Sequence, residues 1–71
     1  MAISYKKLWK LLIDKDMTAV ELRQATGIAP NTMTKLRRDE EVSVAVLAKI
    51  CAVLDANIGD IMDLLPETKG E

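Results

Sequence analysis

The chain has 71 residues, of which 49% are apolar and 30% charged, and its formal net charge is −1. This composition is typical of one small globular domain and excludes a low-complexity chain. A single cysteine and the lack of histidine exclude an intramolecular disulfide and a zinc site, and only 3% aromatic residues disfavour a module that stacks unpaired bases.

The charge is divided unevenly along the chain. Residues 1–38 hold eight Lys/Arg and three Asp/Glu, a net charge of +5, whereas residues 39–71 hold two Lys and eight Asp/Glu, a net charge of −6. A protein that binds duplex DNA needs local rather than global positive charge. The N-terminal apolar run ends at Asp14, so we expect neither a secretory signal nor a membrane span, and a cytoplasmic location.

The first predicted helix covers about residues 4–15, with Ser4 as its cap. Its inward face is expected to hold Tyr5, Leu8, Trp9, Leu12 and Ile13. The opposite face carries Lys6, Lys7 and Lys10, which should face solvent, with one or two of them able to meet phosphate.

The second predicted helix covers residues 18–26 and has clear signals at both ends. Thr18 and Glu21 are spaced for a capping box, and Gly27 can adopt the left-handed conformation that ends a helix. Ile28 follows, where an apolar side chain can fold back onto the helix. The residues expected to pack inward are Val20, Leu22 and Ala25.

The third predicted helix covers residues 30–38, with Pro30 in its first turn. Met33 and Leu36 should face the core. The opposite face is a polar stripe at helical spacing, formed by Asn31, Thr34, Lys35 and Arg38. These residue types suit contacts with base edges and phosphates, although a solvated surface helix could show the same stripe. The short glycine turn before it favours a helix-turn-helix.

An acidic turn follows, with Asp39 able to take the left-handed conformation. Asp39, Glu40 and Glu41 would repel a phosphate backbone, so we expect them to point away from DNA or to pair with Arg37 or Arg38. We do not interpret them as a metal site.

Two more helices are predicted, at residues 43–54 with Ser43 as cap and at 57–65 with Asn57 and Asp60 as a capping pair, before a polar tail at 66–71. Cys51 is expected to be a small core residue. Both helices carry more apolar residues than one buried face needs. This surplus either closes the helical bundle or forms a homodimer surface.

Residues 18–38, TAVELRQATGIAPNTMTKLRR, resemble the helix-turn-helix of the phage-repressor (Cro/CI, XRE) family, and the resemblance extends over about residues 3–65. It implies an all-α, compact five-helix bundle of the lambda-repressor-like DNA-binding class, forming a single domain over residues 1–71. The family's base-reading positions fall on Pro30, Asn31, Thr34 and Lys35, and its phosphate contacts at the preceding helix fall on Thr18 and Ala19.

The chain departs from the family pattern at three positions. Arg23 stands where the family usually has alanine, and its stem must lie along the surface with the charge outside. Ala29 replaces a frequent capping Ser or Thr, and Pro30 replaces a frequent Gln. These departures affect sequence preference more than fold.

The sequence thus predicts a sequence-specific, double-stranded DNA-binding transcriptional regulator, acting as a repressor and reading the major groove with residues 30–38. Arg23, Arg37 and Arg38 are expected to meet phosphates, and a homodimer through residues 43–54 and 57–65 would place two copies on an inverted repeat. The alternative is a protein-interaction module of the same fold, such as an antitoxin or antirepressor. The chain has no residue set for catalysis, and we expect no cofactor, metal or small-molecule ligand.

Overall fold

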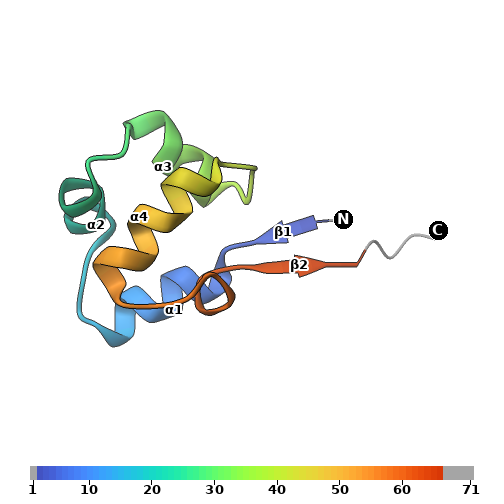
Figure 1. Ribbon diagram of the computed structural model, residues 1–71, viewed down its shortest axis with the longest axis horizontal. Coiled ribbons are helices and arrows are strands. Elements are labelled where there is room, and N and C mark those ends of the chain that lie inside the picture. Colours follow the sequence, from blue (N-terminus) through green and yellow to red (C-terminus); the bar gives the residue numbers. More distant parts are fainter. Residues whose placement is uncertain (1, 67–71) are drawn as a thin grey trace.

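The computed structural model describes residues 2–66 and shows four α-helices, one 3-10 turn and one pair of short strands. In chain order these are β1 (Ala2–Ser4), α1 (Lys6–Asp14), α2 (Ala19–Thr26), α3 (Pro30–Arg37), α4 (Val44–Leu54), η1 (Ile58–Asp60) and β2 (Asp63–Leu65). Helix α4 lies in the middle of the helices, with α2 on the left, α3 above and α1 below, while β1 and β2 extend together to the right (Figure 1).

The expected fifth helix at 57–65 is wrong, and the fold therefore has four α-helices rather than five. The predicted capping pair does start a turn, since the Asn57 N–H donates to Asp60 Oδ2 over 2.9 Å. The turn lasts only through η1, and the chain then extends as β2. Gly59 in this turn is a poor helix former. The chain beyond it finds backbone partners in β1 instead of continuing as a helix.

Strands β1 and β2 are antiparallel, with Ala2 opposite Leu65 and Ser4 opposite Asp63. This pairing also corrects the expected start of the first helix. Ser4 lies in β1, and α1 begins at Lys6 with Tyr5 as its N-cap. The side chain of Ser4 still serves the helix start, since its Oγ accepts the Lys6 N–H over 3.3 Å. Of the expected polar tail, residues 67–71 lie outside the described residues.

One apolar core holds the helices together, and every α-helix contributes to it. Its side chains are at most 5% exposed and are Tyr5, Leu8, Leu12, Leu22, Ile28, Met33, Leu36, Leu47, Ile50, Leu54 and Ile61. Burial of each such side chain contributes about 1.5–3 kcal/mol. Because these residues come from α1, α2, α3 and α4 alike, the core fixes the orientation of all four helices.

Several residues expected to pack inward lie outside. Ile13 is 76% exposed, Val20 is 54% exposed and Ala25 is also exposed. Each lies on a helix of only 8 or 9 residues. One or two fully buried positions, Leu8 and Leu12 in α1 and Leu22 in α2, already complete the core-facing side of such a short helix.

The local signals at helix ends are confirmed. The Glu21 N–H donates to Thr18 Oγ1 over 3.1 Å, and the Thr18 N–H donates to the Glu21 carboxylate over 2.8 Å. Gly27 ends α2 with φ 71°, and Ser43 Oγ accepts the Val46 N–H over 3.2 Å. These local features fix where α2 begins and ends and where α4 begins.

Within residues 2–66, no helix has the length and apolar character that crossing a bilayer requires.

Candidate nucleic-acid interface

Helix α3 has a buried face and an exposed polar face. Met33 and Leu36 are 4% and 0% exposed and pack into the core. The members of the predicted polar stripe are all exposed: Asn31, Thr34, Lys35 and Arg38. Pro30, at the first position of the helix, is exposed as well. Packing of the buried face therefore fixes the helix, and its polar face is open to solvent.

Local geometry limits what Thr34 can offer. Its hydroxyl donates to the Pro30 carbonyl over 3.2 Å, within the same helix. The oxygen then keeps acceptor capacity, and the methyl group stays available. In this rotamer Thr34 suits a base-edge donor such as an exocyclic amine, or the thymine methyl, better than an acceptor.

The start of α2 lies beside α3 across a shallow hollow. This hollow is lined by Ala19, Val20, Arg23, Pro30, Met33, Thr34 and Arg37. Two of the expected phosphate-contacting arginines, Arg23 and Arg37, thus flank it from opposite helices. Arg23 is half-buried, as expected for a side chain whose stem lies along the surface.

The starts of α2 and α3 differ in their capping. Thr18 caps α2 through its side chain, whereas no side-chain hydrogen bond caps α3 at Ala29. Ala29 has no side-chain acceptor, but its carbonyl accepts the Thr32 N–H over 3.0 Å and the Met33 N–H over 3.2 Å, and Pro30 has no N–H. The N–H of Asn31 is therefore the one first-turn amide that a capping side chain would have satisfied. A helix start of this kind favours an external anion, since its partial charge is positive.

The three lysines of α1, which sequence reasoning treated alike, have different surroundings. Lys7 Nζ lies 3.1 Å from Asp63 Oδ1 and donates to the Gly59 carbonyl over 3.1 Å, so it joins α1 to the C-terminal segment. Lys6 instead lines a hollow together with Lys35 of α3. Lys6 was not singled out in the sequence, because only the fold brings the start of α1 beside α3.

The acidic turn after α3 contacts the N-terminal end of α1. Asp39 takes the expected left-handed conformation, with φ 58°. Its carboxylate accepts the Tyr5 N–H over 2.9 Å, and the Tyr5 hydroxyl donates to the Glu40 carbonyl over 2.8 Å. Pairing with Arg37 or Arg38 was one of the two arrangements expected for this turn. The Asp39 carboxylate instead accepts the backbone N–H of Tyr5.

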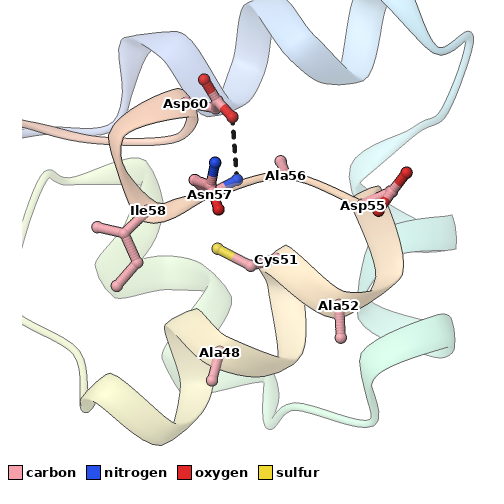
Figure 2. A pocket seen from close by; sticks show the side chains of 8 residues that line it. All are labelled: Ala48, Cys51, Ala52, Asp55, Ala56, Asn57, Ile58 and Asp60. Carbon is pink, nitrogen blue, oxygen red and sulfur yellow. Dashed lines mark hydrogen bonds between the residues drawn. The ribbon is translucent and has the colours of Figure 1, made fainter.

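A second surface lies on the exposed side of α4 and is partly apolar and partly acidic. A wide, open hollow of about 610 Å³ is lined by Ala48, Cys51, Ala52, Asp55, Ala56, Asn57, Ile58 and Asp60. Figure 2 shows the Cys51 sulfur between α4 and the segment around Asn57. Burial, and then the charge of Asp60, raise the pKa of the Cys51 thiol, which favours the unreactive protonated form.

Comparison with known proteins agrees with this geometry. Residues 7–67 match the family model of the Cro/C1-type HTH DNA-binding domain. A solved structure titled "Crystal structure of transcriptional regulator VanUg, Form II" is similar, with 52% sequence identity and a TM-score of 0.90. The match covers 93% of this chain and 88% of that one. No curated protein sequence matches the chain.

The family match spans both helices of the helix-turn-helix and the core around them, and the similar structure has the same fold at high identity. The chain belongs to the Cro/C1-type helix-turn-helix DNA-binding family.

Proposed function

We propose that the protein is a sequence-specific regulator of transcription that binds double-stranded DNA and reads the major groove with α3. The observation that carries this proposal is the exposed stripe of Asn31, Thr34 and Lys35 on a helix whose opposite face is fully packed. A rigid helix with outward polar side chains suits a major groove, which is wide enough to admit it. The similar solved structure is of a protein titled a transcriptional regulator, which supports the same role here.

Each residue of the stripe has a chemical role in this proposal. Asn31 can bond adenine through both ends of its amide, and Lys35 can donate to the guanine acceptors O6 and N7. Thr34 contributes its methyl group or an acceptor. Pro30 has no amide hydrogen and offers apolar contact only, which suits a thymine methyl.

Phosphate contacts would fix this helix in the groove without reading sequence. Arg23 and Arg37 flank the hollow between α2 and α3, and Arg38 follows at the end of α3. Thr18 and Ala19 lie at the start of α2, where backbone amides and the helix dipole favour an anion.

We propose repression as the regulatory outcome. Occupation of an operator can exclude polymerase through the DNA-contacting face alone. Activation would need a further surface that contacts polymerase, and we assign the exposed apolar residues of α4 and the C-terminal segment to self-association instead.

Selection from a random duplex pool near physiological salt tests sequence-specific binding. We expect enrichment of one motif, and an inverted repeat with half-sites about 34 Å apart if two copies bind together. The absence of enrichment by folded protein would contradict the proposal.

Asn31→Ala on the selected duplex tests the reading role directly. We expect a loss of about 1–3 kcal/mol in binding free energy at the selected site, with little change on random duplex. Equal losses on both duplexes would mean that Asn31 touches only the backbone.

We further propose that two copies associate through the exposed apolar residues of α4 and the C-terminal segment. Val44 is 71% exposed, Ile58 41% and Leu64 59%, in a chain segment with few cations. Sedimentation of the wild-type protein and of Val44→Asp and Leu64→Asp variants tests this. A wild-type protein that stays monomeric at concentrations well above those needed for DNA binding would contradict it.

The same exposed residues favour a second candidate function, a protein-interaction module that docks a partner through α4 and the C-terminal segment. Such a module has no use for Lys35 and Arg38 on one stripe. DNA binding that falls steeply with added salt would favour the regulator, because each neutralised phosphate contributes a slope of about −0.9 in log K against log salt.

A further inference from the structure

The end of α3 is tied to the start of α1 by side chains far apart in the sequence. Tyr5 and Asp39 are 34 positions apart, and the Tyr5 N–H donates to Asp39 Oδ1 over 2.9 Å. A second bond runs from the Tyr5 hydroxyl to the Glu40 carbonyl over 2.8 Å. Tyr5 is fully buried whereas Asp39 and Glu40 are exposed, so these bonds tie a surface turn to a residue of the core.

The backbone at Asp39 closes α3 in a manner that favours glycine. The Asp39 N–H donates to the Leu36 carbonyl over 3.3 Å, and the Glu40 N–H donates to the Lys35 carbonyl over 2.9 Å. With φ 58° at Asp39, this is the helix ending in which glycine is the commonest residue, because it has no Cβ to clash. An aspartate here adopts a less favourable backbone conformation, and its carboxylate makes a bond that glycine lacks.

That carboxylate also lies at the start of α1, where the one local side-chain acceptor is Ser4 Oγ, which accepts the Lys6 N–H over 3.3 Å. Tyr5 is the N-cap of α1 without a side-chain cap bond, and the first turn of α1 has no acidic residue. Asp39 therefore places a negative charge at the positive end of a nine-residue helix. The arrangement stabilises one particular placement of the end of α3 against α1.

We propose that Asp39 is a positioning residue for DNA reading, an inference that rests on the proposed role of α3. Lys35 lies directly beside this tie, since its carbonyl accepts the Glu40 N–H, and its side chain lines the hollow that Asp39, Glu40 and Lys6 also line. By holding the end of α3, Asp39 sets how Lys35 and Arg38 project towards a groove. Small displacements of such groups weaken base contacts while leaving the fold intact.

Asp39→Asn and Asp39→Gly separate the bond from the charge. Both variants remove one negative charge, and both residues tolerate the left-handed conformation. Asparagine keeps an oxygen that can accept the Tyr5 N–H, whereas glycine cannot. The measurements are thermal midpoint, hydrogen exchange of the Tyr5 amide, and affinity for the selected duplex and for random duplex.

We expect Asp39→Gly to bind the selected duplex about fivefold more weakly than Asp39→Asn. The thermal midpoint of Asp39→Gly should be no lower than that of Asp39→Asn, and its Tyr5 amide should exchange faster. Both variants should bind random duplex with equal affinity because their charges are equal. If the bond served stability alone, a variant would lose affinity for the selected duplex only when its thermal midpoint also fell.

Asp60→Ala is the matched control. It also removes one carboxylate that accepts a backbone N–H, here from Asn57 on the segment that packs against α1 and α4. We expect it to leave the ratio of selected to random affinity unchanged. Equal affinity of Asp39→Gly and Asp39→Asn for the selected duplex would overturn the positioning role alone, whereas a folded wild-type protein that selects no duplex would overturn the proposed function itself.

Discussion

The helix-turn-helix segment from Thr18 to Arg38 and the segment from Ser43 to Leu65 expose opposite kinds of side chain. The first presents the exposed polar stripe of α3 with arginines beside it. The second exposes Val44, Ile58 and Leu64, and its charges are mostly acidic. Both segments nevertheless bury the same kind of residue, since Leu22 and Leu36 in the first and Ile50 and Leu54 in the second are at most 1% exposed.

This contrast shows that the two segments share one core and differ at the surface. A polar, cationic surface suits a phosphate-lined groove, and an exposed apolar surface suits another protein. We therefore expect a core substitution in either segment to lower the stability of the whole domain. A surface substitution should affect only the binding proposed for its own segment.

Leu36→Ala should have the largest effect. Leu36 is fully buried on the back of α3, and removing such a side chain costs about 2–5 kcal/mol in the free energy of unfolding. Denaturant unfolding monitored by circular dichroism measures this. Ile50→Ala on α4 should cost a similar amount, and a large difference between the two variants would mean that the segments do not share one cooperative core.

Lys35→Ala should separate the segments most sharply. Lys35 is exposed, so we expect a loss of about 1–3 kcal/mol in binding to the selected duplex, and a change in unfolding free energy within about 0.5 kcal/mol. Fluorescence anisotropy and denaturant unfolding measure the two quantities. Lys49→Ala on α4 is the matched control, since it removes the same charge from an exposed position of the other segment. Equal loss of DNA affinity in both variants would contradict the proposed assignment of α3 as the reading helix.

Thr18→Ala and Ser43→Ala compare one helix cap from each segment. Each cap accepts a backbone N–H at the start of its helix, so each variant should lose about 1 kcal/mol in the free energy of unfolding. Only Thr18→Ala should also lower DNA affinity by more than its loss of folding stability accounts for, because Thr18 lies at the proposed phosphate contact. Comparable weakening by Ser43→Ala would remove this distinction.

Tyr5→Phe should show the smallest pH-dependent effect. It removes the hydroxyl's bond to the Glu40 carbonyl, at a cost of about 0.5–1.5 kcal/mol at every pH, and differs from the wild type in its pH profile only at alkaline pH. Burial, and then the charge of Asp39, raise the pKa of Tyr5 above its ordinary value of 10.0. The folded protein thus holds the phenol proton more tightly than the unfolded chain, and this contribution to stability is present below pH 10 and declines as the pH rises beyond it. Tyr5→Phe should show a shallower loss of stability from neutral pH to about pH 11 than the wild type. Parallel pH profiles would show that Tyr5 titrates alike in the folded and unfolded states.

The sequence by itself determined the local features of the helix-turn-helix. The capping box of Thr18 and Glu21, the left-handed Gly27 and the cap at Ser43 each depend on residues within four positions of one another, and all are confirmed. The inward positions Met33 and Leu36 followed from helical spacing for the same reason. The assignment of individual base and phosphate contacts stays a prediction.

Only the tertiary structure decided the C-terminal segment and the surroundings of α3. Ile58, Ile61, Leu64 and Leu65 are apolar at helical spacing, but pairing with β1, some 60 residues earlier in the chain, makes residues 63–65 a strand. The bond between Tyr5 and Asp39 spans 34 positions and has no local signal. Local hydrogen bonds can be predicted from neighbouring residues, whereas backbone pairing and packing between distant segments depend on which surfaces the whole fold brings together.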